Sequence, residues 1–254
     1  MTRFALIGFA VCACAAGQTL SFDVASVKPS EQSFLVLSPQ RSGGRIQWTT
    51  SLPLVLQYAY QMETWRISGA IPEGIFTFEA TTSPDTTTDQ IRLMFQTLLT
   101  ERFKMVAHVT QKDVDGFALK VGKSGIKIKA VKDGDPPPPM PEWFAKFDSK
   151  AWEGQVSTTL EGKGVGAFTG RKVSMAKVAE ALGRLERTLV IDETGLSGTY
   201  YIAFQFARDN MRDDVDLPPL NTALQENTGL KLEKHRGQVE ALVVDRMEKM
   251  PSEN

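Results

Sequence analysis

The residues best suited to acid–base or metal chemistry in this 254-residue chain are its two histidines, His108 and His235. An imidazole transfers protons near neutral pH and binds transition metals. Each histidine comes five residues after the start of an apolar segment, at Phe103 and Leu230, and strand alternation groups it with the polar residues. No H-E-x-x-H or other close ligand spacing accompanies either one. The sequence predicts two solvent-facing histidines at strand ends, and we assign no metal ligand.

Two glycine-containing segments have a partial likeness to catalytic or cofactor motifs. Ser197 lies between Gly195 and Gly198, but the spacing is not the G-x-S-x-G of a nucleophile elbow. The segment 164–170 has three glycines without the G-x-G-x-x-G spacing, and no βαβ unit surrounds it. We interpret the first segment as a tight turn between strands and the second as a loop that leads into a strand. No catalytic or cofactor-binding residue is assigned.

Carboxylates and aromatic side chains are the remaining candidates. The acidic pairs 192–193 and 213–214 are of the type that flanks a sugar in glycosidases, although paired acids in turns are usually solvated. Trp143, Phe144 and Trp152 lie beside a proline run. They either form an exposed recognition segment or pack back onto a domain, and both alternatives stay open.

Charge and length limit the classes of function. The 29 Lys and Arg residues are balanced by 30 Asp and Glu residues, which gives a formal net charge of -1. A nucleic-acid partner or a polybasic contact with a membrane would need a basic excess, so the sequence predicts neither. The chain is long enough for one large domain or two small ones.

The first residues have the pattern of a secretory signal. Arg3 supplies a positive charge, an apolar run covers 4–15, and small residues at 15–17 suit a signal peptidase. The apolar run is about a dozen residues long, which is short of the roughly 20 that a transmembrane helix needs. Both cysteines, Cys12 and Cys14, lie within it. We expect a signal peptide at 1–17 and a mature chain that is periplasmic or extracellular, with no transmembrane segment.

The rest of the chain has the same order of predicted elements in two halves. Each half has a possible leading strand, a helix, two short strands around a turn, a second helix and a closing hairpin. The first half places these at 45–48, 51–60, 65–68 with 75–79, 89–101, and 103–108 with 117–121. The second half places them at 167–169, 174–182, 188–191 with 199–204, 218–227, and 230–235 with 239–244. This agreement indicates an internal repeat.

The order of elements predicts an α+β fold with two similar lobes. Each lobe is helix–hairpin–helix–hairpin, with small and mostly antiparallel sheets. The predicted boundaries are a first lobe at 18–122, a Pro/Gly-rich linker at 123–166 and a second lobe at 167–254. Three caps support the helix positions: Thr87 with Gln90 as a capping box, Ser174 as an N-cap and Gly229 as a C-cap.

Several spaced motifs resemble a known family. They are FDVASVKP at 22–29, QIRLMFQTLLTERFK at 90–104, DETGLSGTY at 192–200, ALQE at 223–226, GLKLE at 229–233 and PSEN at 251–254. Together they are similar to a large family of uncharacterised exported proteins of soil acidobacteria, a domain of unknown function that is sometimes fused to BlaR-type sensor peptidases. The resemblance implies export and this domain type, and it transfers no catalytic residue.

The second half also resembles the short N-terminal domain of secretins and TonB-dependent transducers, on its apolar pattern and its Thr228-Gly229-Leu230 turn. Those domains bind partner proteins in the cell envelope, which implies a possible envelope protein as partner. The sequence favours a non-catalytic periplasmic or secreted binding module. The alternative is a cell-envelope hydrolase with a site between the two lobes, and the sequence names no partner-binding residue for either function.

Overall fold

The computed structural model describes residues 19–32, 34–132, 134, 141, 143, 153–160, 164–208 and 215–252. The expected signal peptide at 1–17, both cysteines, Phe144, Trp152, the acidic pair 213–214 and most of the proline run lie outside these residues. Among the described residues, 43% lie in strands and 24% in helices. Within the same part of the chain, no helix is long and apolar enough to cross a membrane.

The chain divides into two compact units. Unit 1 contains the residues up to His108 together with those from Leu242 onward, and unit 2 contains Val109–Ala241. Each unit has its own hydrophobic core, its own antiparallel sheet and its own pair of α-helices. A third sheet contains strands from both units.

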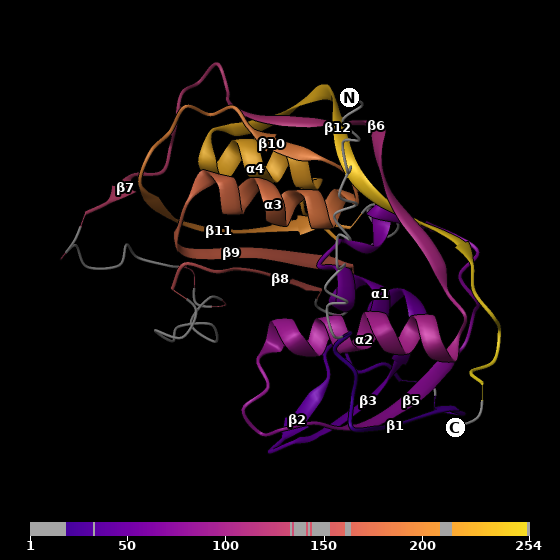
Figure 1. The fold of residues 1–254 in the computed structure, drawn as a ribbon. Helices are drawn as coiled ribbons and strands as arrows, with labels where there is room; N and C mark the ends of the chain where they lie inside the picture. Colours follow the sequence, from indigo (N-terminus) through magenta and orange to yellow (C-terminus); the bar gives the residue numbers. More distant parts are fainter. Residues whose placement is uncertain are drawn as a thin grey trace, which may run out of the picture. The chain divides into compact units, whose positions relative to one another are not determined.

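Unit 1 is built on a sheet with the strand order β1-β5-β3-β2 (Figure 1). In β3, exposed Arg45 and Gln47 alternate with buried Ile46 and Trp48, which is the pattern of a strand with one buried face. The helix α2 begins with the capping box that the sequence predicts, formed by Thr87 and Gln90. The elements of unit 1 are β1 (Val24–Pro29), β2 (Gln40–Ser42), β3 (Arg45–Ser51), α1 (Leu52–Tyr60), η1 (Thr64–Arg66), β4 (Ile67–Gly69), β5 (Ile75–Thr81) and α2 (Thr88–Arg102).

Unit 2 is built on a sheet with the strand order β7-β11-β9-β8. The Ser174 side chain caps α3 by accepting a hydrogen bond from the Lys177 N–H, and Gly229 ends α4 with a φ of 78°, both as the sequence predicts. The elements are β7 (Ala130–Val131), β8 (Val156–Leu160), β9 (Val165–Val173), α3 (Met175–Glu186), β10 (Val190–Asp192), β11 (Thr199–Ala207) and α4 (Leu220–Thr228).

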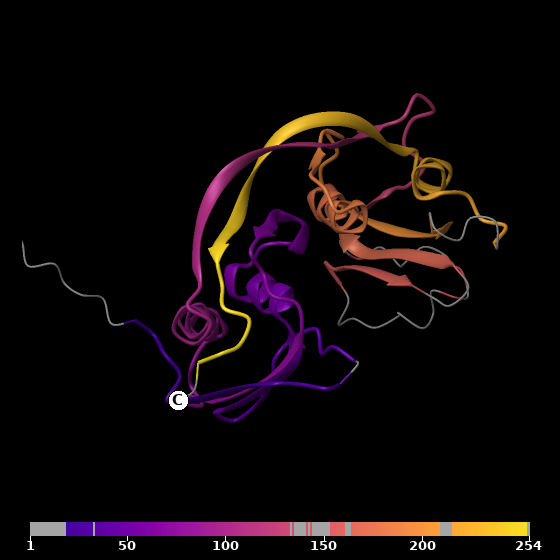
Figure 2. The same cartoon turned by 90° about the vertical axis from the view of Figure 1, so that its right-hand side faces the viewer.

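Two long strands, β6 (Val106–Val121) and β12 (Leu230–Arg246), run from one unit into the other. They are hydrogen-bonded neighbours in the third sheet, whose order is β10-β6-β12-β4 (Figure 2). In unit 2, β10 pairs in parallel with the end of β6. In unit 1, β4 pairs in parallel with the end of β12. Each short strand therefore pairs with the long strand that comes from the other half of the sequence.

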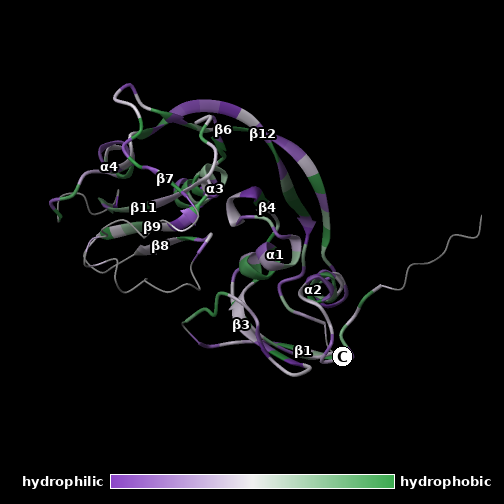
Figure 3. Cartoon of the chain, turned by 90° about the vertical axis from the view of Figure 1, so that its left-hand side faces the viewer, coloured by the Kyte–Doolittle hydropathy of each residue, from purple (hydrophilic) through white to green (hydrophobic). Residues whose placement is uncertain are grey.

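The predicted α+β class, with two helix–hairpin–helix–hairpin lobes, is wrong, because the fold is mostly β and each closing hairpin is one continuous strand. The polar residues between the two predicted strands of each hairpin are mostly exposed positions within β6 and β12. Figure 3 shows this hydrophilic stretch along β12. Neither Gly116 nor Gly237 turns the chain. The earlier hairpins are also absent, since β4 and β5 belong to different sheets, as do β10 and β11.

Candidate functional site

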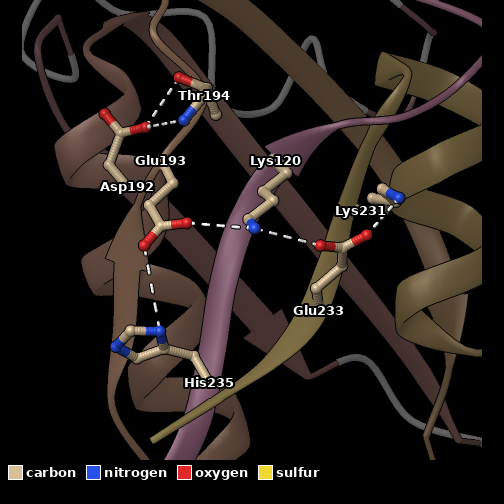
Figure 4. Close-up of polar contacts among 7 residues, drawn as sticks. All are labelled: Lys120, Asp192, Glu193, Thr194, Lys231, Glu233 and His235. Carbon is tan, nitrogen blue, oxygen red and sulfur yellow. Dashed lines mark hydrogen bonds and ion pairs between the residues drawn. The ribbon is translucent and has the colours of Figure 1, made fainter. Parts of the chain in front are cut away.

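The main polar cluster that the structure brings together lies in unit 2, on one face of three neighbouring strands. Lys120 comes from β6, and Glu193 directly follows β10. Lys231, Glu233 and His235 come from β12, where residues two apart point to the same face of the sheet. Figure 4 shows Lys120 at the centre, between the carboxylates of Glu193 and Glu233.

These side chains form one continuous ion-pair network of alternating charge. The Lys120 Nζ lies 3.2 Å from Glu193 Oε2 and 3.2 Å from Glu233 Oε2. The Lys231 Nζ donates a hydrogen bond to the other oxygen of Glu233. At the opposite end, His235 Nδ1 lies 3.9 Å from Glu193 Oε1. That separation is too long for a direct hydrogen bond, so His235 is the least constrained member of the network.

The network shifts the proton affinities of two of its members. Hydrogen bonds to Glu193 and Glu233 raise the pKa of Lys120 above its ordinary value. Hydrogen bonds from Lys231 and then Lys120 lower the pKa of Glu233. Both shifts favour the charged forms, so the network is formed over the whole neutral range of pH. Because these side chains are solvated, their effect on stability is small.

We expect the Glu233→Gln substitution to make the stability of the protein less sensitive to acid. The lowered pKa of Glu233 contributes stability above the ordinary glutamate pKa of 4.5, and this contribution is lost as the pH falls through the lower folded-state value. The variant should therefore be less stable than the wild type at neutral pH, and the difference should shrink to nothing in acid. Urea unfolding at several pH values measures this, with the exposed Glu226→Gln as the control. A difference that is constant with pH would contradict the expectation.

A pocket of about 520 Å³ opens beside His235 in the same unit. Its volume is in the range of small-ligand sites. Its lining includes two residues with cationic side chains, one with a carboxylate, one with an imidazole and one with an aromatic ring. The lining residues are Asp115, Gly116 and Phe117 of β6 and Lys234, His235 and Arg236 of β12.

The two cations of the pocket differ in their partners. Arg236 Nη2 lies 3.8 Å from Asp113 Oδ2, and that carboxylate also accepts a hydrogen bond from Gln238 at 2.9 Å. Lys234 is exposed, and its ammonium group has no partner within the described part of the chain. Lys234 is therefore available to bind a ligand without first breaking an ion pair.

The two histidines lie in different units, and each has a carboxylate nearby. In unit 1, His108 Nδ1 lies 2.9 Å from Asp245 Oδ2, and the His108 side chain is 54% exposed. The His235 side chain is 31% exposed and lies within β12, not at a strand end. The prediction of a solvent-facing position is confirmed for His108 and only partly for His235. In the described residues, neither imidazole is hydrogen-bonded to a hydroxyl group, and no group of His, Cys, Asp or Glu is placed to hold a metal ion.

Of the two glycine-containing segments, the one around Ser197 forms the predicted turn and the segment 164–170 does not form the predicted loop. The residues before β11 form a turn in which Gly195 and Gly198 have φ values of 67° and 90°. The Ser197 carbonyl accepts a hydrogen bond from the Tyr200 hydroxyl. Residues 165–170 of the segment 164–170 are already part of β9, so the prediction of a loop there is wrong. Sequence analysis missed the ion-pair network and the pocket, although the alternation of Lys231, Glu233 and His235 was a usable signal for the network.

The acidic pair 192–193 has two separate roles in the structure. Asp192 Oδ1 accepts hydrogen bonds from the backbone N–H and the hydroxyl of Thr194, at 3.0 and 2.7 Å, which stabilises the turn after β10 (Figure 4). Glu193 instead points into the ion-pair network. The two carboxylates therefore do not act together as a glycosidase pair would.

Comparison with known proteins gives a family and no further relative. A family model described as "Protein of unknown function (DUF3738)" matches residues 54–247. This match includes the whole of unit 2, part of unit 1 and all members of the ion-pair network. No curated protein and no solved structure shows a significant match.

Proposed function

The chain belongs to DUF3738, a family of proteins of unknown function, and we propose that it is an exported, non-catalytic binding module. Its ligand would occupy the pocket between β6 and β12 and would carry a negative charge beside an apolar group. The observation that carries this proposal is Lys234, which has no partner among the described residues and lies at a pocket that also contains Arg236 and Phe117.

Charge supports an anionic ligand. The lining contains the cations of Lys234 and Arg236 and the single carboxylate of Asp115, so the pocket has one formal positive charge in excess when His235 is neutral. A lysine ammonium forms strong charge-assisted hydrogen bonds with carboxylate or phosphate oxygens. The Phe117 ring gives the pocket an apolar wall for the rest of the ligand.

The arrangement of the same groups supports binding over catalysis. General acid–base catalysis needs a proton carrier within hydrogen-bonding distance of its partner. Lys120, Glu193 and Glu233 are instead held in ion pairs with one another. The network links β12, which carries Lys234 and His235, to Lys120 of β6 and to Glu193, and we assign it this positioning role and no part in a reaction.

Two expectations from the sequence belong to the same proposal. Export to the periplasm or beyond is supported by the charged, apolar and small residues of 1–17. An internal repeat is supported by the order of elements, β3-α1-β4-β5-α2-β6 and then β9-α3-β10-β11-α4-β12. An envelope protein as partner would fit an anionic ligand group presented as an aspartate or glutamate side chain or as a peptide C-terminus.

Small aromatic ions test this proposal directly. We expect benzoate and phenyl phosphate to bind to the purified protein, and we expect benzylamine, which has a similar ring and the opposite charge, not to bind. Lys234→Ala should weaken anion binding by about 10-fold, because it removes a charge-assisted hydrogen bond. Isothermal titration calorimetry measures these affinities.

The matched control is Lys123→Ala, which removes an exposed lysine of unit 2 that does not line the pocket. It should leave the affinity for benzoate and phenyl phosphate unchanged. Equal binding of benzylamine, or an equal effect of the two lysine substitutions, would show that the pocket does not select anions.

A further inference from the structure

The loop between β1 and β2 presents large apolar side chains to solvent. Phe34 is 61% exposed, Leu35 43% and Leu37 78%. Figure 3 shows a hydrophobic segment that projects from the sheet of unit 1 beside β3. We propose that Phe34, Leu35 and Leu37, called here the apolar loop, insert into the surface of a lipid bilayer. This proposal is independent of the pocket in unit 2.

The apolar loop is held in place by the residue at its centre. The Val36 N–H donates a hydrogen bond to the Thr49 carbonyl at 2.9 Å, and the Trp48 Nε1–H donates one to the Val36 carbonyl at 2.7 Å. Val36 also packs against the core of unit 1, in which Trp48 is 1% exposed. The exposed residues therefore flank a fixed anchor, so they lose little conformational entropy when they are buried by a partner.

The size of the apolar loop favours a bilayer over a protein partner. Even if fully covered, three side chains bury only a few hundred Å². A stable protein–protein interface buries about 800 Å² on each partner. A bilayer has no such threshold, because each apolar side chain that leaves water contributes its own transfer free energy.

The cation that follows the apolar loop in the sequence is held within unit 1. The nearest strand after the loop contains Arg41, whose guanidinium donates hydrogen bonds to the carbonyls of Thr86 at 2.6 Å and Pro84 at 2.5 Å. Because its guanidinium makes these hydrogen bonds within unit 1, Arg41 is not available to bind lipid headgroups. We therefore expect Arg41 to add little to membrane binding through attraction to anionic lipids.

Flotation with phosphatidylcholine vesicles tests the proposal. The protein used is the mature chain from Gln18 onward, because the apolar run at 4–15 would bind vesicles by itself. We expect this protein to float with the vesicles. The Phe34→Ser/Leu37→Ser double variant should bind at least about 10-fold more weakly, because it removes two apolar side chains from the bilayer.

Leu93→Ser is the matched control, since Leu93 is 47% exposed on α2 and lies outside the apolar loop. It should float as the wild type does. Circular dichroism establishes that each variant is folded. A bimane label at Leu37→Cys adds a direct readout, because the mature chain has no other cysteine. Its emission should shift to the blue with vesicles, while a label at Leu93→Cys should not shift.

Three results would overturn the proposal. The first is a wild-type protein that stays with the soluble fraction. The second is equal flotation of the double variant and the Leu93→Ser control. The third is a wild-type dimer in analytical ultracentrifugation that becomes a monomer in the double variant, which would make the apolar loop a contact between two copies of the chain.

Discussion

The Phe95→Ala substitution should lower the free energy of unfolding of unit 1 by about 3–5 kcal/mol. Phe95 is fully buried, with 0% exposure, and its ring lies edge-on to those of Phe22, Trp48 and Tyr58, at centroid distances of 5.1, 5.5 and 5.8 Å. Alanine would remove both the transfer free energy of the ring and its edge-to-face contacts, and it would leave a cavity. A loss of this size is a large part of the stability of a typical domain.

Urea unfolding followed by tryptophan fluorescence measures this effect, because Trp48 lies in the core of unit 1. Leu93→Ala is the control on the same helix, at a side chain that is 47% exposed. It should change the stability by less than about 0.5 kcal/mol. Equal effects of the two substitutions would mean that α2 does not present Phe95 to the core.

The Gly69→Ala substitution should destabilise the protein by about 2–4 kcal/mol, because it forces β4 away from β12. Gly69 has a φ of 111°, and a Cβ at this position would lie 2.1 Å from the Val244 carbonyl oxygen. The same oxygen accepts a hydrogen bond from the Ala70 N–H at 2.8 Å. The substitution therefore strains the backbone and breaks the parallel pairing between two strands that are far apart in the sequence.

Gly43→Ala separates these two effects. Gly43 also has a positive φ, of 57°, but a Cβ there would meet nothing within 4 Å. The Gly43→Ala substitution should therefore lower the free energy of unfolding by only about 1 kcal/mol, because alanine disfavours the left-handed backbone conformation. Hydrogen exchange at the Ala70 N–H gives a local readout, and it should become faster in Gly69→Ala alone. Equal losses in the free energy of unfolding and equal exchange rates at the Ala70 N–H in the two glycine variants would mean that β4 does not approach β12 as described.

The local elements of the fold could be predicted from the sequence, because their signals lie within a few residues of one another. The spacing of Ile91, Phe95 and Leu98 together with the Thr87 capping box predicts α2, and the structure confirms it. The other α-helices could be predicted for the same reason, from the spacing of their apolar residues and from their caps. A helix satisfies its backbone hydrogen bonds within itself, so its sequence contains most of the information about it.

The sheets could not be predicted in this way, because strand pairing depends on distant residues. The backbone ladder of β6 and β12 continues through polar stretches, and a ladder does not require apolar side chains. In the structure, a Cβ at Gly116 would lie 2.3 Å from the Leu189 carbonyl oxygen, so the glycine allows a close approach of two chain segments.

The candidate site was only partly predictable for the same reason. Alternation correctly groups Lys231, Glu233 and His235 on one face of β12. Nothing in the sequence indicates that Lys120 and Glu193 lie beside them, because they come from β6 and from the end of β10, which pair with each other in parallel.

The passage of β6 and β12 between the units sets the order in which the protein can be completed during its synthesis. Unit 2 is a continuous segment, Val109–Ala241, so all of it is available as soon as its last residue has been made. Unit 1 begins first but needs Leu242 and the residues after it, since Leu242 and Val244 belong to its core and the end of β12 pairs with β4. The N-terminal unit must therefore wait for the C-terminus, and the part of the chain that emerges first is the last to close.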